Sequence, residues 1–229
     1  MSVKANSYQL ARVGPVHFQP LQWELEQVRK YVKGKVMNAG CGNRDLGEIL
    51  GSFGASEVVN YDIESTIPGA VIGSLVDIPI ADDTFDAIIC NAVLEHVPAI
   101  DKVMSELARV LKPGGFFIAG VPYLQPYHLN PTDFRRYTKD GLTELGQIHG
   151  LDTVEVLPVH TIAQTLGWIA WEYAQERGGI RPYIVYPIVW LATRLFHKTD
   201  MALINNANTL QAIYTKPAAK KPAAKKSLK

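Results

Sequence analysis

Short apolar runs alternate along the chain with longer stretches whose apolar residues have helical spacing. The runs predict strands at 36–38, 57–61, 70–72, 85–90, 116–121, 153–159 and 210–217. Recurrence of apolar residues at i, i+3, i+4 and i+7 predicts helices at 20–32, 45–53, 100–111 and 138–149. The run at 85–90 is the most continuous, which places it at the middle of a parallel sheet. The alternation predicts an α/β fold with a doubly wound sheet.

A glycine turn follows the first run. Asn38 ends that run, and Gly40-Cys41-Gly42 leads into a helix. Because glycine has no Cβ, a ligand can lie against the backbone here, and we expect the N–H groups of the turn to point outward toward it. About twenty residues later the second strand ends at Asp62, where a carboxylate would hold the hydroxyls of a ribose. The two elements predict a nucleoside site.

The residues of the turn select among nucleosides. A dinucleotide fingerprint has Gly or Ala at the position of Asp45, and an acid at a helix start repels a pyrophosphate. The stretch instead resembles motif I of the class I S-adenosylmethionine (SAM) methyltransferases, D-x-G-x-G-x-G, with Asn38 in place of the acid and Arg44 in place of the third glycine. The resemblance implies SAM as the cofactor. It assigns cofactor contacts to Asn38, Ala39, Gly40, Cys41, Gly42, Arg44, Asp62 and Ile63.

Three further motifs extend this resemblance to residues 35–121. Asp77 and Ile78 follow the third strand, where an acid can accept from the amine of a purine and an apolar side chain can cover its face; capping a turn is the alternative for Asp77. Leu94-Glu95-His96-Val97 and the corner Leu111-Lys112-Pro113-Gly114-Gly115 resemble the ubiquinone- and menaquinone-type methyltransferases. Asn91 and His96 are expected on the cofactor side.

The loop 122–137 leaves the carboxyl edge of the fifth strand, where open α/β sheets bind ligands. His128 is the first candidate for a base, with Asp133 orienting it or ionising the acceptor; anchoring of the loop is the alternative. Residues expected to face the acceptor are Tyr123, Tyr127, Arg135 and Arg136. The arginine pair would hold a phosphate or carboxylate, or form a solvated face. The string Phe134-Arg135-Arg136-Tyr137-Thr138 resembles methyltransferases of cell-surface polysaccharide and glycolipid assembly.

The family fold is Rossmann-like, with a mostly parallel seven-stranded sheet whose last strand is antiparallel. Here residues 160–209 stand between the sixth and seventh strands as a helical insertion. Its apolar segments at 164–176 and 183–196 have three interpretations: a cap over the acceptor pocket, contact of 181–198 with a membrane surface, and an oligomer interface. We expect the second segment to be kinked or broken at Pro187. At the other end of the chain, His17 and Phe18 either pack on the surface or close over the cofactor.

Composition sets the remaining expectations. With 229 residues and 47% apolar content the chain can form one full core, so we divide it into a segment at 1–34, a methyltransferase domain at 35–215 and a disordered tail at 216–229. The tail holds six lysines, while residues 1–215 have a net charge of −5. No signal peptide, spanning helix or disulfide framework is found, so we expect a cytoplasmic protein. No metal-ligand spacing is found, so we expect no metal. If residues 181–198 contact a membrane surface, the protein would lie at the periphery of the membrane. No base-reading motif accompanies the lysines, and no nucleic-acid substrate is inferred.

The sequence therefore predicts a SAM-dependent methyltransferase acting on a small-molecule or lipid- or sugar-linked acceptor. The departures at Asn38 and Arg44 favour, as an alternative, a SAM-binding protein without catalysis. A nucleotide-dependent oxidoreductase is a third hypothesis.

Overall fold

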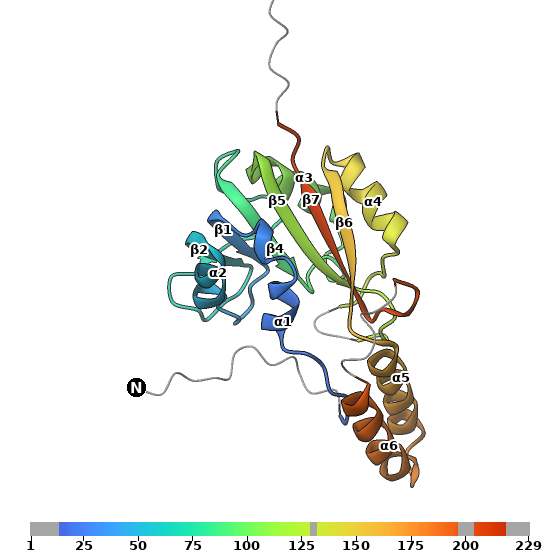
Figure 1. Cartoon of the computed structure of the whole chain (residues 1–229). Coiled ribbons are helices and arrows are strands. Elements are labelled where there is room, and N and C mark those ends of the chain that lie inside the picture. Colours follow the sequence, from blue (N-terminus) through green and yellow to red (C-terminus); the bar gives the residue numbers. More distant parts are fainter. Residues whose placement is uncertain (1–13, 129–131, 197–203, 219–229) are drawn as a thin grey trace, which may run out of the picture.

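A twisted seven-stranded sheet forms the centre of the protein, with strand order β3-β2-β1-β4-β5-β7-β6 (Figure 1). The computed structural model describes residues 14–128, 132–196 and 204–218. The strands are β1 (Gly34–Ala39), β2 (Ala55–Asp62), β3 (Val71–Ile72), β4 (Phe85–Asn91), β5 (Leu111–Pro122), β6 (Asp152–Val159) and β7 (Thr209–Thr215). All neighbouring pairs are parallel except those of β7, which runs antiparallel to both β5 and β6. The expected fold class and the antiparallel last strand are confirmed.

Alternation of side chains along the central strands produces two apolar cores, one on each face of the sheet. Met37 and Ile88 pack with α3 (Ile100–Val110) and α4 (Lys139–Ile148) on one face. The adjacent residues Val36 and Ile89 pack with α1 (Leu21–Glu26) and α2 (Gly47–Phe53) on the other. The first predicted helix is shorter than expected, since α1 ends at Glu26 and a separate 3-10 turn, η1, covers Arg29–Tyr31.

The fifth strand begins five residues earlier than the apolar run indicated. Leu111 pairs with Phe85 and Phe116 with Ala87, so the segment between them bulges out of register instead of ending the pairing. Gly114 permits this path because it has φ +77°. Asp86 accepts from the backbone N–H of Lys35 at 2.8 Å, which ties the start of β4 to β1.

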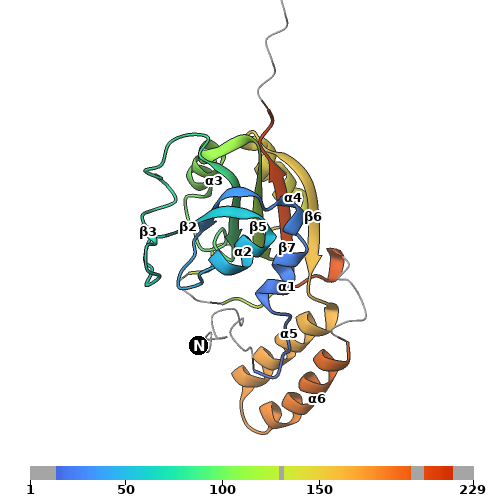
Figure 2. The same cartoon turned by 60° about the vertical axis from the view of Figure 1, so that its left-hand side comes forward.

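The insertion between β6 and β7 is a helical hairpin that projects beyond the sheet in both views (Figures 1 and 2). It consists of α5 (Ile162–Arg177) and α6 (Arg181–Leu195), followed by the 3-10 turn η2 (Ile204–Asn206). The helices approach closely at Gly167, where a Cβ would lie 2.9 Å from Val189 Cγ1. Of the two outcomes expected at Pro187, a kink or a break, the break is wrong, because α6 continues through that residue.

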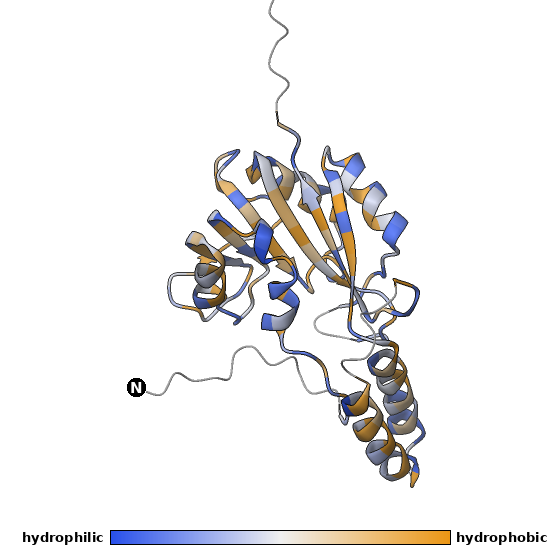
Figure 3. Ribbon diagram, viewed as in Figure 1, coloured by the Kyte–Doolittle hydropathy of each residue, from blue (hydrophilic) through white to orange (hydrophobic). Residues whose placement is uncertain are grey.

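Much of the hairpin is apolar and exposed (Figure 3). On α6, Ile184, Ile188, Leu191 and Leu195 recur on one helical face and are each at least half exposed. None of the helices within the described residues has the length and hydropathy needed to cross a bilayer. His197 and Lys198 of the expected membrane-contact segment lie outside the described residues, as do 219–229 of the tail and 1–13 of the N-terminal segment.

Candidate functional site

The glycine turn is held to the second strand through its own N–H groups. Gly40 and Cys41 both donate to the carbonyl of Tyr61, at 2.8 and 3.1 Å, and Gly42 donates to Asp62 Oδ2 at 2.7 Å. The expectation that these N–H groups face a ligand is therefore wrong, because β2 lies beside β1 in a register that brings Tyr61 opposite Ala39. The turn still leaves space. Within the described residues, and apart from Gly42 and its two chain neighbours, no atom lies within 4 Å of the position that a Cβ on Gly42 would take.

Asp62 ends β2 with its carboxylate fixed beside this turn. Oδ2 accepts from Gly42 and Oδ1 accepts from the N–H of Glu64 at 2.9 Å. Because an ionised carboxylate has about four lone-pair sites, both oxygens can still accept from a pair of hydroxyls. The next residue, Ile63, is 73% exposed although it is apolar. A fixed hydrogen-bond acceptor for the sugar, beside an exposed apolar side chain that can cover the base, suits a nucleoside.

Two departures from motif I have structural roles. Asn38 is buried and its amide donates to the carbonyl of Arg44 at 2.9 Å and to Asn60 Oδ1 at 2.8 Å. Asn38 thus links the two ends of the turn, and Ala39 and Cys41 are buried beside it. Arg44 contributes its carbonyl to this closure and is half-buried.

The residues expected at a purine differ in exposure. Asp77 is exposed, whereas Ile78 is 2% exposed and packs in the core. Glu106 and Arg109 of α3 clamp the backbone of Ile78: Glu106 Oε2 accepts from its N–H at 2.7 Å, and Arg109 donates to its carbonyl at 2.8 Å. Hydrogen bonds from the same Arg109 lower the pKa of Glu106. This clamp fixes the segment that presents Asp77.

A cavity of about 290 Å³ opens at the carboxyl edge of β4, β5 and β6. Apolar and aromatic side chains, including Phe18 and Trp168, line part of it. Its polar lining includes Asn91, Glu95, His128 and Thr209 together with Glu24, His160 and Asn208. Among the described residues, three polar atoms of this lining are buried without a partner: Glu95 Oε2, His160 Nδ1 and Asn208 Nδ2. Since unpaired buried polar atoms are costly, the cavity is suited to a polar ligand.

Glu24 and His160 are two residues of this cavity that sequence reasoning missed. His160 Nε2 lies 3.2 Å from Glu24 Oε1, and both side chains are almost fully buried. His160 also has φ +64°, which is uncommon outside glycine, and its ring stacks edge-on against Phe18 with centroids 4.9 Å apart. The segment that contains His17 and Phe18 therefore reaches the cavity.

The loop candidates separate into three groups. His128 lines the cavity, and Tyr123 lines a neighbouring groove beside α5. Tyr127, Arg135 and Arg136 border a third, more open depression, so the structure does not bring all the expected acceptor residues together.

Asp133 lies within the protein and is bound on both oxygens by Arg136. It also accepts from the N–H of His128 at 3.0 Å. Hydrogen bonds from Arg136 and from that N–H, together with the Arg136 charge, hold the pKa of Asp133 below its usual range despite burial. Asp133 and Arg136 thus neutralise each other and stabilise the loop that contains His128.

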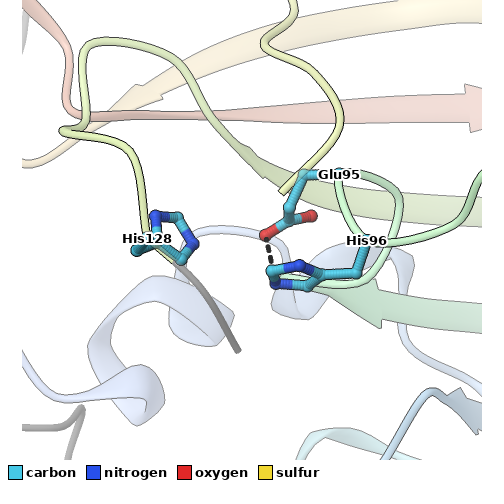
Figure 4. Close-up of side chains that lie close together, drawn as sticks. All are labelled: Glu95, His96 and His128. Carbon is cyan, nitrogen blue, oxygen red and sulfur yellow. Dashed lines mark ion pairs between the residues drawn. The ribbon is translucent and has the colours of Figure 1, made fainter. Parts of the chain in front are cut away.

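His96 lies with Glu95 and His128 beside the cavity (Figure 4). His96 Nε2 is 3.6 Å from Glu95 Oε1, and the potential ligand atoms of all three residues lie within 4.8 Å of one another. Burial raises the pKa of Glu95, which is 1% exposed. The cluster therefore contains a carboxylate that needs a neighbouring positive charge or a proton.

Comparison with known proteins is consistent with this architecture. Residues 37–119 match the family described as methyltransferase domain. A probable S-adenosylmethionine-dependent methyltransferase of Mycolicibacterium smegmatis is 29% identical over 140 residues, which cover 54% of each chain. The demethylmenaquinone methyltransferase of Symbiobacterium thermophilum is 43% identical over 101 residues, covering 36% of this chain and 40% of that protein.

Among solved structures, the cyclase SpnF superimposes with a TM-score of 0.59 at 18% identity, covering 86% of this chain and 81% of SpnF. At that identity the likeness concerns the fold alone. The chain spans about half or less of the length of the curated relatives it matches. Residues 37–119 are thus similar to a methyltransferase domain, and the seven-stranded sheet that contains them has the fold of solved methyltransferase structures.

Proposed function

We propose that the protein transfers a methyl group from SAM to a small-molecule or lipid-linked acceptor bound in the 290 Å³ cavity. The observation that carries this proposal is the shared edge: the Asp62 carboxylate and the cavity both lie at the carboxyl ends of the parallel strands. A nucleoside at Asp62 and an acceptor in the cavity would meet above Asn91, the last residue of β4.

The proposed position of SAM follows from the fixed groups of the site. Asp62 holds the ribose through its free lone pairs, Ile63 covers the ligand, and Asp77 accepts from the adenine amine. The turn at Gly40–Gly42 contributes close approach of the backbone. The positively charged sulfonium lies toward the cavity, where Glu95 is buried.

Methyl transfer is an in-line displacement in which an acceptor lone pair bonds to the methyl carbon as the carbon–sulfur bond breaks. S-adenosylhomocysteine leaves, and an acceptor hydroxyl also loses its proton. Alignment of the two reactants contributes about 7–11 kcal/mol in well-oriented cases. A positioned base adds roughly 10²–10⁴-fold. His128 is the first candidate for that base, and Asp133 holds its loop rather than taking the proton itself. His160, which also lines the cavity, is the second candidate.

The lining of the cavity favours an acceptor with an apolar body and a polar end, since Phe18 and Trp168 lie in the same space as unpaired polar atoms. One relative is named for a menaquinone precursor, which has that character. We further propose that α6 rests on a membrane surface, with the exposed face of Ile184, Ile188, Leu191 and Leu195 toward lipid and Arg181 near the headgroups. The helix packed against α6, α5, contributes Trp168 to the cavity. A membrane bound to α6 would therefore bring a lipid-linked acceptor close to the cavity.

Labelled SAM tests the proposal. We expect calorimetry to show one SAM per chain, and a panel of quinols, phenols and lipid extracts to yield labelled product and S-adenosylhomocysteine with at least one acceptor. SAM binding without turnover across the panel would favour the alternative of a SAM-binding protein without catalysis. That alternative is motivated by the departures from motif I at Asn38 and Arg44.

A further inference from the structure

The buried contact between Glu95 and His96 joins two atoms that both need a positive partner. His96 Nδ1 lies 2.6 Å from the carbonyl of Thr132, which can only accept a hydrogen bond, so Nδ1 carries a hydrogen. In a neutral ring Nε2 then has a bare lone pair, and this atom faces Glu95 Oε1 at 3.6 Å. A lone pair and a carboxylate do not attract each other. Either a proton or a cation must lie between them.

His128 has the same tautomer on different grounds. Its Nδ1 lies 3.2 Å from the carbonyl of Pro126 and 3.3 Å from Arg136 Nη2. Both hydrogens of Nη2 have closer acceptors, namely Pro126 O at 3.0 Å and Asp133 Oδ2 at 2.6 Å. The ring of His128 therefore donates from Nδ1 to Pro126, and in the neutral ring its Nε2 is also bare.

Two imidazoles that each donate from Nδ1 to a backbone carbonyl are oriented as metal-binding histidines usually are. Figure 4 shows both rings and the Glu95 carboxylate turned toward a common space. The second oxygen of Glu95, Oε2, is buried without a partner. Ligand atoms about 2.0–2.2 Å from an ion are at most about 4.4 Å apart. The ligand atoms of the three side chains lie within 4.8 Å of one another, so small side-chain rotations would bring them to the separation that an ion requires.

We propose that Glu95, His96 and His128 bind a divalent transition-metal ion that holds an oxygen of the methyl acceptor. Two imidazoles and one carboxylate suit zinc or ferrous iron and leave coordination positions open. Glu95 and His128 also line the cavity, so an open position would face it. This inference rests on the proposed function for the identity of the bound oxygen, and it departs from the sequence-based expectation of no metal.

The two roles of His128 exclude each other. A nitrogen bound to an ion cannot take a proton, so His128 is either the base or a metal ligand. Arg136 does not repel the ion strongly, because its charge is paired with buried Asp133.

Cobalt(II) is the probe, because its visible d–d absorption reports nitrogen and oxygen ligands without any acceptor. We expect one cobalt per chain and displacement of cobalt by zinc. His96→Ala, His128→Ala and Glu95→Gln should each weaken binding at least tenfold, whereas His149→Asn, a histidine paired with Asp101 elsewhere, should not. Circular dichroism establishes that each variant is folded. Cobalt affinity unchanged in His96→Ala and His128→Ala, or absent in the parent protein, would overturn the site.

A second measurement does not depend on the variants. Nitrogen-15 NMR of the histidine rings near pH 7.5 should show Nε2 of His96 and His128 unprotonated before metal is added. Protonation of both nitrogens of His96 would instead make it a cation paired with Glu95 and overturn the proposal. Cobalt binding needs neither SAM nor acceptor, so failure of the metal site can be told apart from failure of the proposed function. Calorimetry of SAM binding to His128→Ala tests the second separately, because loss of the metal site should leave SAM affinity unchanged.

Discussion

His160 Nε2 lies 3.2 Å from Glu24 Oε1 and so joins the end of β6 to helix α1, with both side chains buried. The contact ties the N-terminal helix to the point where the hairpin leaves the sheet. Both residues line the cavity, so the pair also shapes the proposed acceptor site.

Glu24→Ala and His160→Ala should each destabilise the fold by about 1–3 kcal/mol, because each leaves a buried polar side chain without its partner. The double variant should cost less than the sum of the two. Urea unfolding of the three variants measures the coupling. Glu26→Ala is the control, since Glu26 is an exposed neighbour paired only with Arg29. Additive effects would show that the two residues act independently.

Asp62→Ala should weaken SAM binding at least tenfold, because it removes the ribose acceptor and the bond that fixes Gly42. Calorimetry measures the dissociation constant. Glu64→Ala is a matched control, since it keeps the backbone N–H that Asp62 accepts and removes only an exposed side chain. An unchanged dissociation constant in Asp62→Ala contradicts the ribose assignment.

Stability should depend on pH through Asp86. Lys112 donates to both carboxylate oxygens and lowers the pKa of Asp86 from its ordinary value of 3.8. A folded-state pKa below the unfolded value means that the stabilisation is present above pH 3.8 and is lost as pH falls through the folded pKa. Asp86→Asn should therefore lower the unfolding free energy by about 1–3 kcal/mol at pH 7. The difference from the parent protein should shrink toward zero in acid.

Thermal or urea unfolding at several pH values tests this. The exposed Asp152, at the start of β6, provides the comparison: Asp152→Asn should shift stability little at any pH. A constant difference between Asp86→Asn and the parent protein down to strong acid would rule out the carboxylate as its source.

Ile188→Glu/Leu191→Glu should lower binding to anionic phospholipid vesicles at least tenfold, since it places two charges on the exposed face of α6. Vesicle co-sedimentation is the measurement, and Ile148→Glu on α4 is the control because Ile148 is equally apolar and 67% exposed. Loss of a dimer in analytical ultracentrifugation, without any vesicle binding by the parent protein, would assign this face to an oligomer interface instead.

The order of apolar runs and helical stretches was sufficient to predict the sheet and the placement of Asp62 at its edge. The contacts of the glycine turn were not predictable, because they depend on the register that places Tyr61 opposite Ala39. Glu24 and His160 belong to no motif, and only the approach of α1 to the end of β6 makes them partners. Likewise, the backbone carbonyls that lie beside Nδ1 of His96 and Nδ1 of His128 cannot be located from spacing along the chain.

The antiparallel pairing of β6 with β7 has one more consequence. Val159 stands opposite Thr209, so the chain departs for the hairpin and comes back at neighbouring points of the sheet. A connection with adjacent ends can be lengthened, shortened or exchanged without altering strand register. Replacing the hairpin with a foreign loop would therefore keep the sheet and change which acceptor the cavity selects.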